Sequence, residues 1–171
     1  MNPDILNQHP EPQPPGLPDA FWRSMMTRGN EAFRAGKFGP ALADYQNAVV
    51  EATRLLQLAS RGVELESTSP APALVVACGN AANAFTEISE NEQAFAILRE
   101  AIERLAAVIS RPEAPLAVRM SCLENMNRAS ALLLDTMRAC SCTDADIDAE
   151  FSAGRSTMER CIQALNQTQT N

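Results

Sequence analysis

The stretch GNEAFRAGKFGPALADYQNA, residues 29–48, decides how this chain is expected to fold. Gly36 divides the stretch into two helical segments, because glycine readily adopts the left-handed conformation that ends a helix. Small residues recur where two helices would cross closely: Gly29, Ala32, Ala41 and Ala48. Large residues recur where a third helix would pack: Phe33, Phe38 and Tyr45. The stretch therefore predicts two helices joined by a tight turn.

The composition extends this prediction to the whole chain. Hydrophobic residues make up 46% of the 171 residues and aromatic residues only 5%, and the β-branched and aromatic runs typical of strands are missing. We therefore expect an all-α fold with helices near residues 20–35, 40–65, 73–89, 92–110, 116–139 and 144–165. Six prolines predict a disordered tail over residues 1–18, the Ser/Pro-rich segment 67–72 predicts a linker, and residues 166–171 form a polar tail.

The pattern of small residues occurs twice. Ala82, Ala94 and Ala101 reproduce the intervals between Gly29, Ala41 and Ala48, because 94 − 82 and 41 − 29 are both 12, and 101 − 94 and 48 − 41 are both 7. The period is 82 − 29, or 53 residues. Agreement at both intervals indicates an internal repeat. The third pair of helices keeps the same plan, but its small residues do not align with the first two.

These residues resemble the tetratricopeptide repeat. Residues 22–50 match it best and residues 75–103 less closely, with Arg28 in place of the usual leucine and Ser89 in place of the turn glycine. Residues 74–82 also resemble a group of small bacterial proteins of this class. The resemblance implies one domain over residues 19–165, built as a right-handed superhelical array of about three antiparallel hairpins (20–65, 73–110 and 116–165). In such arrays the first helix of each hairpin lines a concave groove.

The resemblance places eight candidate partner-binding residues on that groove: Arg23, Met26, Asn30, Phe33, Arg34, Asn80, Asn83 and Glu87. The asparagines would hydrogen-bond the backbone of a bound segment, with apolar contact from Met26 and Phe33. Alternatively, the asparagines bond to one another or to helix ends, and Phe33 belongs to the core. The carboxylate clamp of chaperone-binding members is not expected, because Met26 takes the place of its first lysine.

Charge and residue types argue against several other functions. The net charge of −7 disfavours a nucleic-acid partner, and no apolar run approaches the roughly 18 residues of a membrane span. The N-terminus lacks a basic-then-apolar leader, so we expect a cytoplasmic protein. The one histidine, His9, lies in the proline-rich tail, and glycine-rich phosphate loops are absent. We therefore expect that the protein is not an enzyme and that it binds no cofactor and no metal.

The five cysteines are expected to be mainly buried structural thiols, with redox sensing or a metal half-site at Cys140 and Cys142 as alternatives.

Two functions remain open. The first is a non-catalytic adaptor or chaperone that holds a peptide or protein segment in its groove. The second is a self-associating scaffold, a possible homodimer, whose groove is filled by its own tail or by a second copy. An adaptor groove should be open and lined by polar residues, whereas a scaffold groove should be occupied or apolar.

Overall fold

The computed structural model describes residues 20–65 and 69–169, and within this range the chain forms six α-helices and no strand. The helices are α1 (Ala20–Arg34), α2 (Phe38–Ser60), α3 (Pro70–Glu87), α4 (Asn91–Ile109), α5 (Leu116–Ala139) and α6 (Asp144–Gln169). The all-α prediction is confirmed, whereas the predicted tail at residues 1–18 lies outside the described residues. No described helix is long and apolar enough to cross a membrane.

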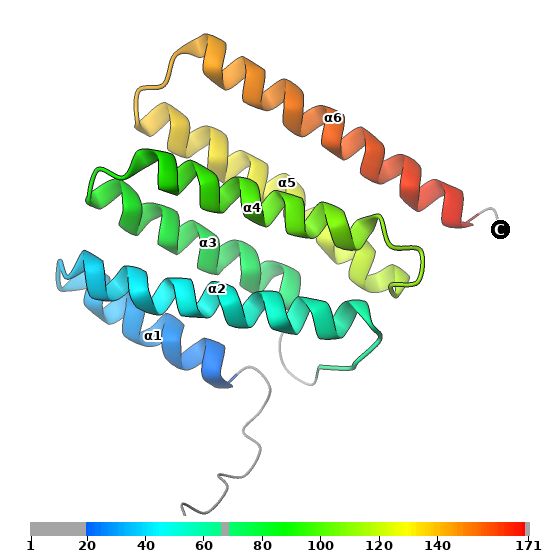
Figure 1. Ribbon diagram of the computed structural model, residues 1–171, viewed down its shortest axis with the longest axis horizontal. Coiled ribbons are helices and arrows are strands. Elements are labelled where there is room, and N and C mark those ends of the chain that lie inside the picture. Colours follow the sequence, from blue (N-terminus) through cyan, green and yellow to red (C-terminus); the bar gives the residue numbers. More distant parts are fainter. Residues whose placement is uncertain (1–19, 66–68, 170–171) are drawn as a thin grey trace, which may run out of the picture.

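Successive helices run antiparallel and pack in order along one axis, with α1 at one edge of the molecule and α6 at the other (Figure 1). Three polar contacts join helices that are two apart. Asn80 Nδ2 on α3 donates to Asn30 Oδ1 on α1 at 3.1 Å, and Arg104 Nη1 on α4 donates to Thr53 Oγ1 on α2 at 3.0 Å. Arg99 on α4 pairs with Glu150 on α6 at 2.8 Å. Odd-numbered helices therefore contact one another in one layer and even-numbered helices in a second layer.

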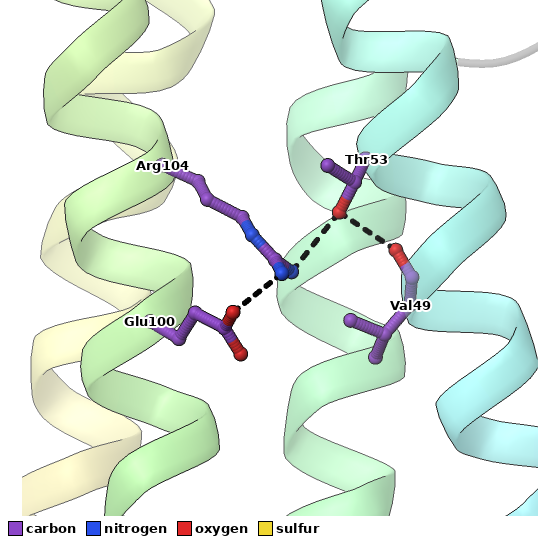
Figure 2. Close-up of polar contacts among 4 residues, drawn as sticks. All are labelled: Val49, Thr53, Glu100 and Arg104. Atoms are coloured by element: carbon purple, nitrogen blue, oxygen red, sulfur yellow. Dashed lines mark hydrogen bonds and ion pairs between the residues drawn. The ribbon is translucent and has the colours of Figure 1, made fainter.

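Arg104 makes the bridge between α2 and α4 (Figure 2). Its guanidinium group extends from α4 toward α2, and Glu100 Oε1 accepts a hydrogen bond from Nη2 at 2.5 Å. The Thr53 hydroxyl donates to the Val49 carbonyl at 2.8 Å, so its oxygen is oriented to accept from Arg104. The bridge fixes the spacing of two helices that have α3 between them in the packing order.

Small residues make the close helix crossings possible. Ala41, Ala48, Ala82, Ala94 and Ala101 are all buried, as the repeat predicts. Gly29 shows how tight the contact between α1 and α2 is, because a Cβ atom added there would lie 2.6 Å from Cε1 of Tyr45. Real Cβ atoms do not approach a neighbour that closely, so only glycine fits against this ring.

The turns within the three helix pairs share one geometry, which also occurs at Gly62 after α2. The turn residues Gly36, Ser89 and Ser141 have φ values of 72°, 63° and 59°, and lie 53 and 52 residues apart. The amide that follows each turn residue donates back to the carbonyl five residues earlier in the chain: Lys37 to Ala32 at 2.9 Å, Glu90 to Phe85 at 2.9 Å, and Cys142 to Met137 at 3.0 Å. This is the Schellman helix ending, and it uses serine twice where glycine is usual.

The predicted boundary between α2 and α3 is wrong at both ends. α2 ends at Ser60 instead of continuing to about residue 65, because Gly62 adopts a φ of 82° and the Val63 amide turns back to bond the Leu58 carbonyl. α3 begins at Pro70, inside the segment predicted as a linker. Proline is well suited to the first helical turn, where its missing amide has no helical partner to lose.

The start of α6 is as predicted. The Asp146 amide donates to the Thr143 hydroxyl at 3.2 Å, and that hydroxyl donates to the Asp146 carboxylate at 2.6 Å. Thr143 thereby satisfies one of the amides left unpaired at a helix N-terminus. The helix continues to Gln169, beyond its expected end near residue 165.

Replacing Gly29 with alanine should destabilise the protein. The new methyl group would meet the buried Tyr45 ring, and overpacking of this kind costs roughly 1–3 kcal/mol, more than the gain of about 1 kcal/mol in helix propensity. Gly79→Ala is the matched control, because its Cβ would lie 3.4 Å from Leu132 Cδ1, an ordinary contact. Urea unfolding should show a lower free energy of unfolding for Gly29→Ala and an equal or higher value for Gly79→Ala. Equal effects of the two changes would mean that the Tyr45 ring does not constrain α1.

Glycine at either serine turn should stabilise the protein. A left-handed backbone costs an L-residue about 1 kcal/mol, and glycine avoids most of this cost. Ser89→Gly and Ser141→Gly should therefore raise the midpoint of thermal unfolding by roughly 2–4 °C, as about 1 kcal/mol does in a chain of this size. Ser110→Gly is the control, because Ser110 ends α4 with a right-handed φ of −76°. A lower midpoint for the turn variants, like that expected for Ser110→Gly, would contradict the strain at these turns.

Candidate functional site

A cleft between α1 and α3 brings together five of the eight predicted groove residues. We call it the α1–α3 cleft. It has a volume of about 200 Å³ and is lined by Asn30, Phe33, Arg34, Tyr45, Asn80 and Asn83. Phe33 is half-buried and packs edge-on against Phe38, with 5.2 Å between ring centroids, so it contributes to both the core and the cleft.

Hydrogen bonds order the polar side chains of this cleft. Asn30 Oδ1 accepts from the Tyr45 hydroxyl at 2.9 Å and from Asn80 Nδ2 at 3.1 Å. Burial raises the pKa of Tyr45, with the charge of Arg34 acting in the opposite direction, so the phenol remains a donor at neutral pH. Asn80 therefore bonds to Asn30, as the alternative hypothesis for the asparagines expected. Among the described residues, Asn30 Nδ2, Asn80 Oδ1 and the side-chain amide of Asn83 have no hydrogen-bond partner.

A second cleft continues this surface onto α5. The α3–α5 cleft has a volume of about 590 Å³. Its lining consists mainly of polar residues: Asn83, Thr86, Glu87, Ser89, Asn91, Leu132, Asp135, Thr136, Ala139 and Cys140. Asn83 belongs to both clefts, so the two form one groove over α1, α3 and α5.

Three polar residues occupy equivalent positions along this groove. Asn30, Asn83 and Asp135 each precede a left-handed turn residue by six positions, since 36 − 30, 89 − 83 and 141 − 135 are all 6. Asn30 and Asn83 line the first cleft, and Asn83 and Asp135 line the second. We call these three residues the polar ladder. Because each is counted from the same turn geometry, they come from the same helical position of α1, α3 and α5.

Two predicted groove residues lie outside both clefts. Met26 is buried in the core, with 6% of its surface exposed, so its side chain packs within the fold. Arg23 is exposed on α1 but lines neither cleft. The eighth predicted residue, Glu87, lines the α3–α5 cleft, whereas Arg34 lines the α1–α3 cleft.

The groove changes charge along its length. Arg34 lines the α1 end, and Glu87 and Asp135 line the other end. Asp135 also accepts a hydrogen bond from Arg138 at 2.8 Å. Residues 21–38 carry four basic residues and one acidic residue, but Arg28 among them forms an ion pair with Asp44 on α2.

Burial keeps Cys78 and Cys122 in the unreactive thiol form. All five are free thiols, and Cys78, Cys122 and Cys161 are buried. Burial raises the pKa of Cys78 and of Cys122 to about 12, so at neutral pH both remain thiols rather than nucleophilic thiolates. Burial also raises the pKa of Cys140. Within residues 20–65 and 69–169, no group of three or more histidine, cysteine or acidic side chains could hold a metal ion.

The sequence prediction missed Tyr45 and the α5 wall of the groove. Tyr45 was assigned only to packing, but its hydroxyl reaches the cleft from α2. The α5 residues were missed because the small residues of the third pair of helices do not align with those of the first two pairs. Counting back from the turn residue would have found Asp135.

No curated protein and no solved structure gives a significant match to this chain. The model of a family described as protein of unknown function (DUF2753) matches residues 20–170, so the chain belongs to this family.

Proposed function

We propose that this protein is a tetratricopeptide-like array of three helix hairpins and works as a non-catalytic adaptor or chaperone. The bound partner is a protein or peptide segment, and its binding site is the groove over α1, α3 and α5. The observation that carries the proposal is the polar ladder of Asn30, Asn83 and Asp135, which repeats once on each of these helices.

The repeat supports the fold proposed here. The same Schellman ending occurs at Gly36, Ser89 and Ser141, and polar contacts within each layer join helices two apart. Repeated units of this kind stack so that each contacts only its neighbours, which creates an extended binding surface. A right-handed superhelix is the arrangement that the tetratricopeptide resemblance implies.

The chemistry of the groove suits a peptide backbone. An asparagine side chain carries both an amide donor and a carbonyl acceptor, which match the C=O and N–H groups of a peptide bond. Asn30, Asn80 and Asn83 offer such groups at the groove surface, and Phe33 offers an adjacent apolar contact. Both clefts are lined mainly by polar residues, which is what we expected of an adaptor rather than of a self-filled scaffold.

Cytoplasmic location and lack of catalysis are part of the same proposal. Five free thiols without a disulfide are typical of proteins kept in a reducing compartment. In the α3–α5 cleft, burial raises the pKa of the Cys140 thiol and Asp135 is paired with Arg138, so neither is an activated nucleophile or general base.

Asn83→Arg tests the groove most directly, because Asn83 lines both clefts and is exposed on α3. Random peptides displayed on phage are selected on the wild-type protein, and the dissociation constants of the selected peptides are measured by fluorescence anisotropy. The arginine side chain should fill the junction of the clefts, and the hydrogen bonds proposed between the Asn83 side-chain amide and the bound peptide should be lost. We expect a dissociation constant raised about tenfold, equivalent to about 1.4 kcal/mol.

Asn47→Arg is the matched control, since Asn47 is an exposed asparagine on α2 and lines neither cleft. It should leave peptide binding and the thermal midpoint unchanged. Selected peptides that bind wild type and Asn83→Arg equally well would remove the groove from consideration. So would failure to select any peptide.

A further inference from the structure

Counted from the first residues of α2, α4 and α6, which are 53 residues apart, the apolar positions of α2 and α4 continue into α6. Tyr45, Leu98 and Phe151 are 53 residues apart, and so are Leu56, Ile109 and Ile162. Their burial differs sharply. The first two members of each set are at most 2% exposed, whereas Phe151 is 56% exposed and Ile162 is 43% exposed. The same apolar positions are therefore buried in two helices and exposed in the third.

Packing explains the difference. α3 packs closely along α2, and α5 packs closely along α4. α6 forms one edge of the molecule, and no helix of the described residues packs along it in that way (Figure 1). A face that two equivalent helices bury is thus left open on α6. Terminal units of repeat proteins usually present a polar outer face.

An apolar hollow adjoins the exposed side chains. This α5–α6 cleft has a volume of about 280 Å³. Its apolar lining comes from three helices: Ile102, Ala131, Leu133, Leu134, Phe151 and Met158. A protruding phenyl ring and an apolar hollow therefore lie side by side on one surface. Such a surface is self-complementary, which an interface between two identical copies about a twofold axis requires.

We propose that this surface binds a second copy of this chain, with the two α6 helices antiparallel. Phe151 and Ile162 are 11 residues, or three turns, apart and therefore lie on the same helix face. Antiparallel pairing about the midpoint between residues 156 and 157 places Phe151 of each copy opposite Ile162 of the other. Because Phe151 lines the α5–α6 cleft, Ile162 of each copy then faces the edge of this cleft in the other copy.

Charge supports this register. Arg155 pairs with Glu159 within the chain at 3.3 Å, and both side chains are exposed beside the apolar stripe. In the antiparallel arrangement, Glu159 of one copy lies opposite residue 154 of the other copy and therefore next to Arg155 of that copy. Both flanking contacts across the twofold axis are then between opposite charges, although each chain carries a net charge of −7.

The available surface is large enough. A helix of 26 residues is about 39 Å long, and a strip two helices wide is roughly 20 Å across, which gives roughly 800 Å² per copy. Stable interfaces bury about this area on each partner. The residues of the α5–α6 cleft are separate from those of the peptide groove, so dimer formation leaves the groove accessible.

The mass of the full chain in solution tests the proposal. Sedimentation equilibrium of wild type should give twice 18.5 kDa, and Phe151→Glu should shift the protein to the monomer mass. Phe21→Glu is the matched control, because Phe21 is similarly exposed, at 60%, but lies on α1 at the opposite edge. Circular dichroism should show unchanged helix content in both variants. A wild type that stays monomeric up to millimolar concentration, or a dimer that persists in Phe151→Glu, would overturn the proposal.

A charge exchange tests the register independently. Arg155→Glu and Glu159→Arg each place like charges at both contacts across the axis, so each variant alone should show a dimer dissociation constant raised at least tenfold. An equimolar mixture of the two variants should form heterodimers, because both contacts are again between opposite charges. Dimers of the single variants as tight as wild type, or no recovery in the mixture, would exclude this antiparallel register.

Discussion

The close approach of neighbouring helices is the constraint on which this structure depends. Ala41, Ala48, Ala94 and Ala101 bury no side chain beyond a methyl group, and Gly29 has room for none against the Tyr45 ring. The close approach also brings polar groups of different helices within reach of one another. Because α1 lies so near Tyr45, the hydroxyl of this α2 residue reaches Asn30 on the groove side of the molecule.

The repeated turn converts this packing into a binding surface. The same Schellman ending closes α1, α3 and α5, and the residue six positions before each of these three turns lines the groove. Two of the three turns reach the required conformation with serine, at the cost of backbone strain. The groove therefore depends on where the left-handed turn conformation occurs in the chain more than on whether glycine or serine adopts it.

The sequence predicted the helices well and the groove only in part. Periodic apolar residues located all six helices, because amphipathic spacing is a local property of the chain. The end of α2 and the start of α3 were misplaced, since Gly62 and Pro70 acted as a helix stop and a helix start within what was taken as helix and linker. The hydroxyl of Tyr45 was missed because its position depends on how α1 and α2 pack, which residue spacing along one helix does not contain. Asp135 was missed because the turn from which it is counted has a serine, Ser141, instead of the usual glycine.

The internal repeat underlies both the polar groove and the apolar edge, with a spacing of 53 residues except between Asn83 and Asp135, where it is 52. Repetition places an equivalent polar residue on α1, α3 and α5, and it equally places equivalent apolar residues on α2, α4 and α6. α2 and α4 each have helices packed along both sides and bury these positions, whereas α6 is the last helix and leaves them exposed. Burying a phenylalanine or isoleucine side chain contributes about 1.5–3 kcal/mol. A second copy is a suitable cover because it meets the exposed stripe with an identical stripe and with opposite charges at its margin.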